Sequence, residues 1–301
     1  MSGDATAAVI VHWRHPDETL GCLAGVRGVD GVRAIVVDNG GSPAIRDRLP
    51  ADVVVVRSER NLGYAGGANL GIRAALAADA AIVAVLNDDA RVAPDAWRAA
   101  AARLASDPRV AVVGPKVRLR DDPSALWLAW GDVTWRQSLV ALHGDRVPDG
   151  PAFAAVRDVD WIAGCAMWMR AAAVRALGDF DEAFFAYHEE VEWCTRARRA
   201  GWRVVYDPAV EVAHGGRGTG GGRAAIRIRK YFTARNSILF ARKHGTAAQR
   251  WKLAASLALT LPLQWGRHLF DGEAGDVALK LRGIRDALAD RPPPFEELGL
   301  R

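Results

Sequence analysis

Short runs rich in Val and Ile alternate with segments of helical periodicity through the first part of the chain. The runs cover residues 8–13, 33–38, 53–57, 81–87 and 110–117, and the helical segments cover residues 17–26, 64–78 and 94–105. This alternation predicts an α/β fold with a mainly parallel, doubly wound central sheet flanked by helices. Ligands of such sheets bind beyond the carboxyl ends of the strands. We therefore expect the functional residues in the loops that follow the runs.

The pattern changes after residue 118. Residues 118–156 combine Pro, Gly and Asp with three tryptophans, which indicates an insertion or a hairpin. The segments expected after it are a strand over 159–169, a helix over 189–200 that ends at Gly201, and short strands over 203–206 and 209–213. Residues 215–222 are glycine-rich and have the composition of a mobile loop.

The last part of the chain is expected to be helical. Residues 224–244 have the pattern of a basic helix, and residues 249–270 that of an apolar helix interrupted by Pro262. The apolar stretch is too short to cross a bilayer, but it could lie in a membrane interface or pack on the main domain. We predict a main domain over residues 1–245 and a C-terminal helical segment over residues 246–301.

The net charge of +5 is local. Residues 217–252 hold ten Arg or Lys and no acidic residue, whereas the rest of the chain holds 30 basic and 35 acidic residues. Such a patch suits phosphates or an anionic membrane surface, and it equally suits a solvated helix face. No nucleic-acid partner is expected, because the stretch has no recognised motif and no interleaved aromatic platform beyond one Tyr-Phe pair.

The cysteines and the N-terminus bear on the compartment. The three cysteines form no CxxC pair, which argues against a disulfide framework or a structural zinc site. The first residues lack the pattern of a secretory signal, and charged residues interrupt every apolar run. We expect a cytoplasmic protein, with peripheral contact at the inner face of the membrane left open. The oligomeric state is not predicted.

The second run ends in Asp38 and Asn39, which a Gly turn and Ser42 follow. A carboxylate at the carboxyl end of a strand can accept hydrogen bonds from a nucleobase or a ribose. Asp at such a position is equally typical of turn chemistry.

A glycine-rich segment follows the third run. Gly63 and Gly66 open a helix whose N-terminal amides could face an anion, with Asn61 and Asn69 as neutral hydrogen-bond donors. The spacing differs from GxGxxG, and no glycine follows the first run. A dinucleotide or S-adenosylmethionine site is thereby disfavoured.

The fourth run ends in Asn87, Asp88 and Asp89. Hard oxygen ligands at this edge of a sheet suit Mg²⁺ or Mn²⁺ that bridges a diphosphate. The alternative is that these side chains make turn or helix-cap hydrogen bonds. His214, at the end of a short strand, is a candidate contact for a metal or a phosphate, and a structural histidine is the alternative.

Three acids, Glu189, Glu190 and Glu192, occupy the first turn of the helix expected over 189–200. The helix dipole and the free amides there favour ionised carboxylates. An ionised carboxylate beside a sugar-sized cleft can act as general base toward a hydroxyl. Acids at this position also stabilise helices, and we expect at least one of the three to do only that.

Taken together, these segments resemble one family. They read VVDNGGS at 36–42, NLGYAGGANLGI at 61–72, LNDDARVAP at 86–94 and AGCAMWMR at 163–170, and they continue through 178–214 to KYFTARNSILF at 230–240. In this order they resemble the inverting nucleotide-sugar glycosyltransferases of family 2, and in particular the rhamnosyltransferase-like branch. The resemblance covers about the first 245 residues. It implies the GT-A fold, a Rossmann-like α/β domain, here with a C-terminal helical extension.

The resemblance implies roles on the donor side. Asp38 matches the acid that contacts the nucleotide base, with Asn39 and Ser42 beside it. The loop around the nucleoside and diphosphate is matched by Asn61, Gly63, Gly66 and Asn69. Asn87 and Asp89 fall on the outer positions of a DXD-type motif, with Asp88 between them. Asp89 and His214 are then the expected ligands of a divalent metal, Mg²⁺ or Mn²⁺.

The resemblance also implies a base and a reaction. Glu190 occupies the place of the catalytic base, and Glu189, Trp161 and Trp193 are placed on the acceptor side, with core packing as the alternative for the two rings. The reaction would be inverting transfer from a donor like dTDP-rhamnose or a UDP-hexose to a hydroxyl of a glycan, a glycolipid or a natural product.

The chain departs from the family pattern at two places. Asn87 replaces the first carboxylate of the metal motif, and Glu190 is one methylene longer than the usual Asp, which changes the reach of the base. The alternative function is a non-catalytic nucleotide-sugar or glycan-binding protein of the same fold.

Overall fold

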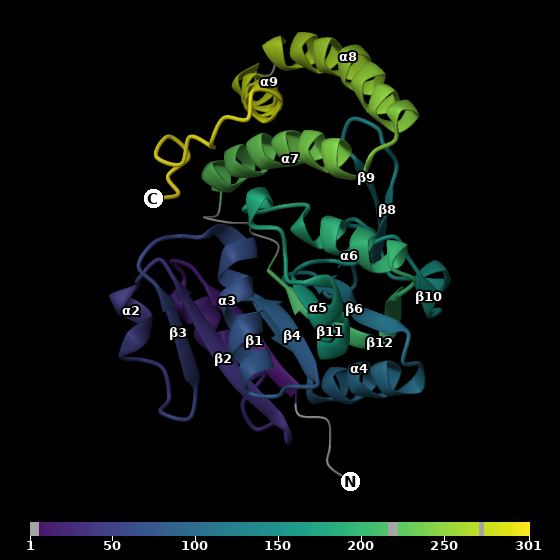
Figure 1. Cartoon of the computed structure of the whole chain (residues 1–301). Helices are drawn as coiled ribbons and strands as arrows, with labels where there is room; N and C mark the ends of the chain where they lie inside the picture. The colour runs from purple at the N-terminus through teal and green to yellow at the C-terminus, as the bar shows by residue number, and fades with distance from the viewer. Residues whose placement is uncertain (1–5, 216–221, 271–273) are drawn as a thin grey trace. The chain divides into compact units, whose positions relative to one another are not determined.

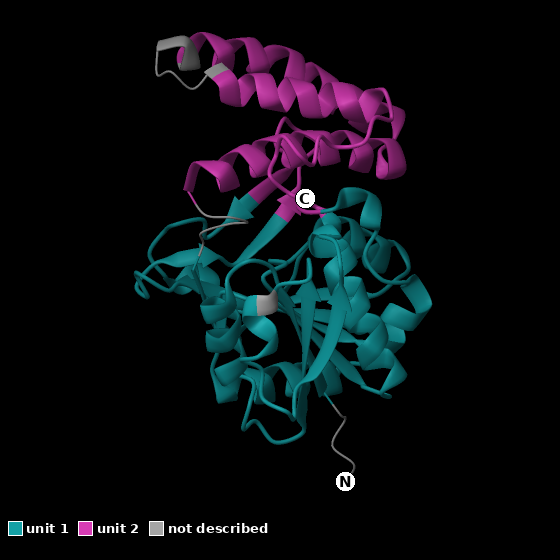
Figure 2. Ribbon diagram, turned by 90° about the vertical axis from the view of Figure 1, so that its left-hand side faces the viewer, with its two compact units in different colours: residues 1–131, 142–185, 189–216 teal, residues 132–141, 186–188, 217–301 magenta. Residues whose placement is uncertain are grey.

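The computed structural model describes residues 6–215, 222–270 and 274–301 (Figure 1). The chain divides into two compact units (Figure 2). Unit 1 consists of Met1–Gly131, Leu142–Phe185 and Glu189–Gly216, and unit 2 of Asp132–Ala141, Ala186–His188 and Arg217–Arg301. The boundary expected after residue 245 stays a prediction.

A mixed, mainly parallel sheet forms the centre of unit 1 (Figure 1). Its main strands are β1 (Thr6–His12), β2 (Val32–Asn39), β3 (Val54–Ser58), β4 (Ile82–Asn87), β6 (Val110–Leu119), β11 (Ala166–Arg170) and β12 (Arg203–His214). β4, β1, β2 and β3 lie side by side and run parallel, and β6 and β12 form a second parallel pair. β11 joins the two sets and runs antiparallel to both β4 and β6. The predicted sheet is confirmed.

Helices flank this sheet in unit 1. They are α1 (Pro16–Ala24), α2 (Pro43–Arg46), α3 (Gly63–Ala77), α4 (Pro94–Ser106), α5 (Ala171–Leu177) and α6 (Glu189–Arg199). The inner strands are buried on both faces, as a sheet covered by helices requires. Close packing of α3 depends on glycine, because a Cβ atom on Gly71 would lie 2.1 Å from Val9 Cγ1.

The segment at 118–156 contains the hairpin that the sequence indicates. It holds β7 (Leu126–Leu128), β8 (Trp130–Val133), β9 (Val140–His143) and the short 3₁₀ helix Pro151–Phe153, and β8 pairs with β9 in a two-stranded sheet. β10 (Arg157–Asp158) follows and pairs with β12. The expected strand over 159–169 is shorter than predicted, since only Ala166–Arg170 is extended and paired.

β12 differs from the sequence prediction. Two short strands were expected, over 203–206 and 209–213, but Arg203–His214 is one strand with a register shift between Asp207 and Glu211. Pro208 lies at the shift, and proline has no N–H to donate to the ladder, which explains the irregularity. Of the glycine-rich segment 215–222, residues 216–221 lie outside the described residues.

Unit 2 is built from three helices, α7 (Gly222–His244), α8 (Ala247–Phe270) and α9 (Ala274–Leu288). Leu253, Leu257 and Leu261 of α8 pack with Ala241 of α7 and Val277 of α9. α8 continues through Pro262. Among the described helices, none combines the length and the apolar character needed to cross a membrane.

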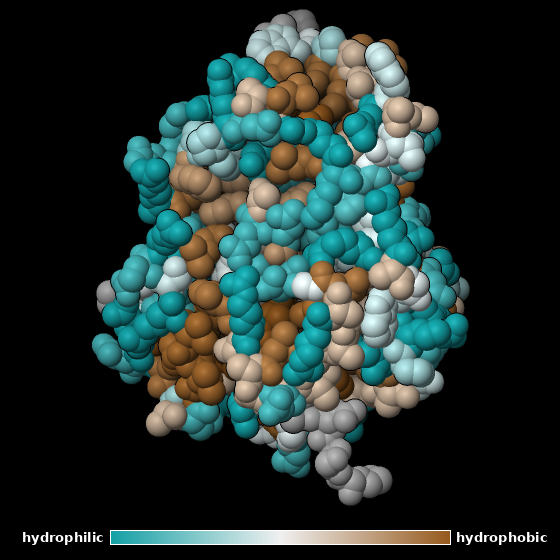
Figure 3. Space-filling model, viewed as in Figure 1, coloured by the Kyte–Doolittle hydropathy of each residue, from teal (hydrophilic) through white to brown (hydrophobic). Residues whose placement is uncertain are grey.

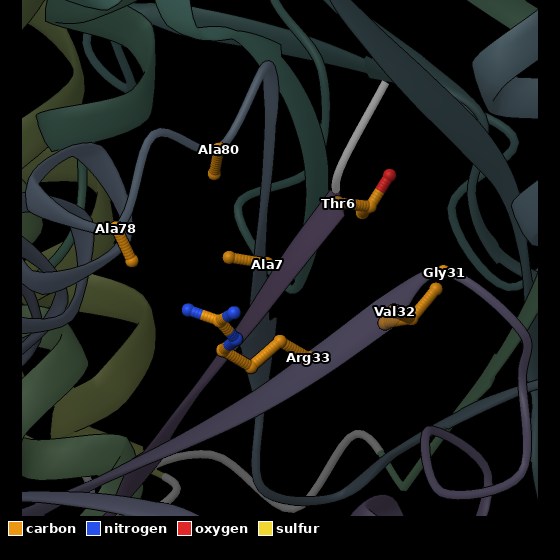
Figure 4. Close-up of a pocket in the computed structure, with 7 residues that line it drawn as sticks. All are labelled: Thr6, Ala7, Gly31, Val32, Arg33, Ala78 and Ala80. Carbon is orange, nitrogen blue, oxygen red and sulfur yellow. The ribbon is translucent and has the colours of Figure 1, made fainter. Parts of the chain in front are cut away.

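A hollow opens at the amino ends of β1 and β2 (Figure 4). Thr6 and Ala7 of β1 lie there beside Val32 and Arg33 of β2, and Ala78 and Ala80 line it from the connection after α3. The polar residues singled out by the sequence follow the opposite, carboxyl ends of these strands.

Candidate active site

The carboxyl ends of β1, β2 and β4 bring two predicted positions, Asp38 and Asn87, to one edge of the sheet, next to His12. His12 is in register with Asp38, and Val11 with Asn87. His12 is fully buried, and its Nδ1 lies 2.6 Å from Thr19 Oγ1. Burial lowers the pKa of His12 despite the nearby charge of Asp38. This histidine is therefore neutral at pH 7.

His214 reaches this edge through strand pairing. The short strand β5 (Ala90–Val92) follows the Asp pair and runs antiparallel to β12, with Ala90 opposite His214. His214 Nε2 donates to Asp89 Oδ1 at 2.9 Å. The side-chain nitrogen of Asn87 lies 3.2 Å from His214 Nε2. Burial raises the pKa of Asp89, but the hydrogen bond and charge of His214 outweigh it and leave that pKa lowered.

Asp88 has a different environment from Asp89. Burial, and then the charge of Asp89, raise the pKa of Asp88 to about 8, although the backbone N–H of Trp13 donates to its carboxyl group. Most Asp88 side chains therefore carry a proton at pH 7. The two adjacent acids thus differ in charge at the same strand end.

A basic network that the sequence analysis did not identify lies beside Asp89. Arg120 donates to both carboxylate oxygens of Glu18, at 2.6 and 2.8 Å, and Arg91 donates to the same carboxylate at 2.7 Å. These two guanidinium groups lower the pKa of Glu18 to about 2. A Cβ atom on Gly215 would lie 2.9 Å from Asp89 Oδ2 and 3.1 Å from Arg120 Nη2. No motif marks these residues, because their contacts join distant parts of the chain.

Asp89, His214 and Asn87 fit a divalent cation by their chemistry. A carboxylate, an imidazole and an amide oxygen are suitable ligands for Mn²⁺ and, apart from the imidazole, for Mg²⁺. Glycine at position 215 also leaves the space beside Asp89 Oδ2 free of a side chain. In residues 6–215, 222–270 and 274–301, no three His, Cys, Asp or Glu side chains converge as a preformed cluster. The amide oxygen of Asn87 is the candidate for a third protein ligand beside Asp89 and His214.

The chain enters α6 through an unusual backbone. Phe185, Tyr187 and His188 have φ values of 61°, 66° and 69°, a region that non-glycine residues rarely adopt. Asn236 of α7 donates to the carbonyl groups of Ala186 and Tyr187, at 2.8 and 2.6 Å. The sequence pattern did not reveal this backbone conformation or the hydrogen bonds that Asn236 makes to it.

Glu189 and Glu190 differ in exposure. Glu189 is buried, and burial followed by the charge of Glu190 raises its pKa well above the ordinary range. The expectation that the helix dipole keeps the acids of this turn ionised is therefore wrong for Glu189, since burial outweighs the dipole. Glu190 is only partly buried. Glu192 is fully buried and pairs with Arg196 at 2.8 Å, which is the helix-stabilising role expected for one of the three acids.

A turn at Gly164 and Cys165 links Glu190 to the strand end at Asn87. A Cβ atom on Gly164 would lie 3.4 Å from Glu190 Cβ and Cγ, and the Cys165 carbonyl accepts from the Asn87 N–H at 2.9 Å. The hydroxyl of Tyr64 donates to the Gly164 carbonyl at 2.6 Å. The predicted base and Asn87, the first residue of the predicted metal motif, thus both contact one short turn within unit 1.

The side-chain amides of two predicted donor-side residues form hydrogen bonds within the protein. Asn39 donates to the Gly63 carbonyl and accepts from the Leu62 N–H, both at 2.9 Å. Asn69 is fully buried, and its amide pairs with both the N–H and the carbonyl of Phe180, again at 2.9 Å. These side chains hold the backbone around the predicted site, and the Asn69 amide, expected as a donor near an anion, is instead bonded to Phe180.

The remaining donor-side residues shape the loop after β2 and β3. Asp38 is buried and accepts from the Ser42 N–H at 2.8 Å. Asn61 accepts from the Gly63 N–H at 2.9 Å. Gly63 has φ +74°, and a Cβ atom there would lie 2.3 Å from the Phe185 carbonyl oxygen. A Cβ atom on Gly66 would lie 2.7 Å from Leu62 Cβ. Both glycines are therefore required by close packing.

The tryptophans expected on the acceptor side are packed in the interior. Trp193 has no exposed surface, and its Nε1 donates to the Gly178 carbonyl at 2.9 Å. Trp161 is also buried, and its ring covers Gly131. Both rings fill core space rather than face a ligand. Trp127 is instead partly exposed, and its ring centre lies 4.4 Å from that of His214.

Comparison with known proteins identifies the family. Residues 15–243 match the family described as "Glycosyltransferase like family 2". The chain belongs to this family. It is 30% identical over 256 residues to the N-acetylglucosaminyl-diphospho-decaprenol L-rhamnosyltransferase of Mycobacterium tuberculosis, covering 76% of this chain and 81% of the relative. It is 24% identical to the hexosyltransferase Agl10 of Haloferax volcanii, covering 70% of this chain and 67% of the relative.

Solved structures confirm the fold of this glycosyltransferase. The mannosyltransferase PcManGT from Pyrobaculum calidifontis, in complex with GDP-Man and Mn²⁺, matches with a TM-score of 0.58 and 17% identity, covering 96% of this chain and 88% of that one. GalNAc-T7 with UDP, GalNAc and Mn²⁺ matches with a TM-score of 0.54 and 15% identity, covering 79% and 51%. The fold is therefore GT-A, and the resemblance to family 2 and its rhamnosyltransferase-like branch is confirmed.

Proposed function

We propose that this glycosyltransferase moves a sugar from a nucleoside-diphospho-sugar to a hydroxyl acceptor and inverts the anomeric configuration. The donor is a dTDP-rhamnose or a UDP-hexose type, and the acceptor is a glycan, a lipid-linked glycan or a natural product. Two relatives named for rhamnosyl and hexosyl transfer support the sugar class. Two solved neighbours that hold a nucleotide or nucleotide sugar with Mn²⁺ support the donor class.

The observation that carries the proposal is the turn at 164–165. Glu190 packs against Gly164, and the Asn87 N–H donates to the Cys165 carbonyl, which supports a base at Glu190 and a cation-binding strand end at Asn87 close to the same turn. The donor diphosphate would lie against the Asn87 and Asp89 side chains. Asp89 and His214, with the amide oxygen of Asn87, would hold a divalent ion, which neutralises charge on the leaving diphosphate.

Glu190 acts as general base in this proposal. The acceptor oxygen attacks the anomeric carbon as the bond from that carbon to the diphosphate oxygen breaks, and the acceptor proton passes to the Glu190 carboxylate. Glu189 is the more buried neighbour, and burial together with the charge of Glu190 raises its pKa well above its ordinary value, which favours its neutral form. In this proposal the negative charge of the pair is placed on the partly exposed Glu190.

Donor binding would use the ends of β1 and β2. Asp38 stays our candidate for contact with the nucleotide base, with Ser42 and Asn61 shaping the adjacent loop. Arg120, whose guanidinium lies beside Asp89 and Gly215, is placed to attract the diphosphate. The Trp127 ring packs on His214 and would add an apolar surface beside the bound donor.

Binding and turnover of a donor panel test the proposal. Nucleoside diphosphates and their sugars, with and without Mn²⁺, should raise the unfolding midpoint when they bind the native protein. With the bound donor and an acceptor glycoside, the product should have an anomeric configuration opposite to that of the donor, as read by NMR. A product of retained configuration would contradict the mechanism. Binding without transfer or hydrolysis of any activated sugar would favour the alternative, a non-catalytic nucleotide-sugar-binding protein.

A further inference from the structure

One face of α8 in unit 2 is apolar and exposed. The opposite face packs through Leu253, Leu257 and Leu261. On the outer face, Trp251 is 75% exposed and Leu259 and Leu263 are each 68% exposed. Trp265, Ala255, Ala258 and Pro262 are exposed on the same helix. Apolar side chains are visible at the surface over α8 and α9 (Figure 3). Large exposed apolar side chains gathered on one helix face indicate an interaction surface.

The charges on α8 have a single sign. Arg250 and Lys252 are exposed near its start, and Arg267 is exposed near its end. The sequence has no Asp or Glu between residues 217 and 270, so α8 carries no acid at all. A partner surface must therefore be apolar enough to cover the leucines and negatively charged where it meets the ends of the helix.

The arrangement along α8 matches the interface of a bilayer. Trp251 and Trp265 are separated by about 21 Å along a helix axis, with the exposed leucines between them. Tryptophan prefers the boundary between lipid headgroups and acyl chains, and basic side chains bind anionic headgroups. A helix of this kind lies in the plane of the interface.

A second copy of the chain fits this surface less well. Antiparallel pairing of two α8 helices would place Arg250 and Lys252 of one copy against Arg267 of the other, and parallel pairing would place each cation against its own equivalent. Both arrangements bring like charges together with no acid on α8 to balance them. Anionic lipid supplies the opposite charge and the apolar phase at once.

We infer that the outer face of α8 docks on an anionic lipid bilayer, with the helix parallel to the membrane plane. This docking goes beyond the proposed transfer reaction, because no residue placed in the catalytic site lies on α8. It would hold the enzyme at a surface where lipid-linked acceptors are concentrated. One face of α8 then packs in the core of unit 2, and the opposite face contacts the membrane.

Co-sedimentation of the full chain with vesicles tests the inference. The wild type should bind phosphatidylcholine vesicles that contain phosphatidylglycerol, should bind pure phosphatidylcholine more weakly, and should lose the difference at high salt. Leu259→Glu and Leu263→Glu should each weaken partitioning by roughly tenfold or more, since each removes exposed apolar surface and adds a negative charge. Lys252→Glu should remove most of the preference for anionic vesicles.

Matched controls separate docking from misfolding. Leu142→Glu places the same change at a 46% exposed leucine of β9 in unit 1 and should leave partitioning unchanged. Far-UV circular dichroism should be native in all variants, and transfer to a water-soluble acceptor should be unchanged in the α8 variants. Equal vesicle binding by wild type and Leu259→Glu, or no binding by wild type, would overturn the inference. So would a dimer in sedimentation velocity that dissociates in Leu263→Glu, because the surface would then bind a second copy.

Discussion

Asn69 links α3 to the segment that leads into α6, and its replacement by Ala tests whether that link is structural. The amide pairs with both backbone groups of Phe180, and all of these groups are buried. Leaving a buried donor and a buried acceptor unpaired costs about 1–3 kcal/mol for each group. The better helix propensity of Ala returns about 0.5 kcal/mol. We expect the free energy of unfolding to fall by about 1.5–5.5 kcal/mol.

Urea denaturation followed by circular dichroism measures this loss, and isothermal titration of the donor measures binding by the protein that stays folded. Asn61→Ala is the matched control. Its oxygen accepts from the Gly63 N–H at 2.9 Å and from the Asn39 amide at 3.3 Å in a less buried place, so about 1 kcal/mol is expected. If Asn69→Ala keeps the wild-type unfolding free energy and weakens donor binding tenfold, Asn69 is a ligand contact and the structural assignment fails.

Three further perturbations address packing, charge and the metal ligands. Gly71→Ala should destabilise the protein by about 1–3 kcal/mol, because the new methyl group would overlap Val9. Gly150→Ala has open space around its Cβ position and should change stability by less than about 0.5 kcal/mol. Equal losses of unfolding free energy in urea denaturation would contradict this. The pKa of Asp88 is raised from 3.8 to about 8 in the folded protein. The unfolding free energy of the wild type, relative to that of Asp88→Asn, should therefore decline as the pH rises from 3.8 to about 8. Parallel pH profiles of the two proteins would refute this raised pKa. His214→Ala should raise the Mn²⁺ concentration needed for half-maximal transfer and weaken Mn²⁺ binding measured without donor; unchanged binding would remove His214 from the ligand set.

Much of the fold could be predicted from the sequence because its signals are local. The Val and Ile runs gave the strands β1 to β4 and β6, and the polar residues after them lie at one sheet edge because parallel strands end together. The helix-stabilising role of one of the three acids, which Glu192 fills, and the end of α6 just before Gly201 followed from helix-terminus chemistry. The sequence predicted two short strands where the structure has one strand, β12, with a register shift between Asp207 and Glu211.

The parts of the candidate site that escaped prediction depend on tertiary contacts. Burial of Glu189 reverses the effect expected from the helix dipole, and no local pattern reports how deep a helix terminus lies. Trp193 and Asn69 have the residue types of ligand contacts, but their partners, Gly178 and Phe180, are reached only after folding. The Glu18 and Arg120 pair shows the same limit, since it joins α1 to the residue that follows β6.

The role of Glu190 is tested most sharply by comparing two isosteric changes in neighbouring residues. Glu190→Gln should reduce the single-turnover rate of sugar transfer by about 10²–10⁴-fold while the dissociation constant of the donor stays near the wild-type value. Glu189→Gln should retain most of the rate, because burial raises the pKa of Glu189 and so favours the neutral form that Gln imitates. Undiminished transfer by Glu190→Gln, measured beside a Glu189→Gln variant that has lost it, would show that the base is not at position 190.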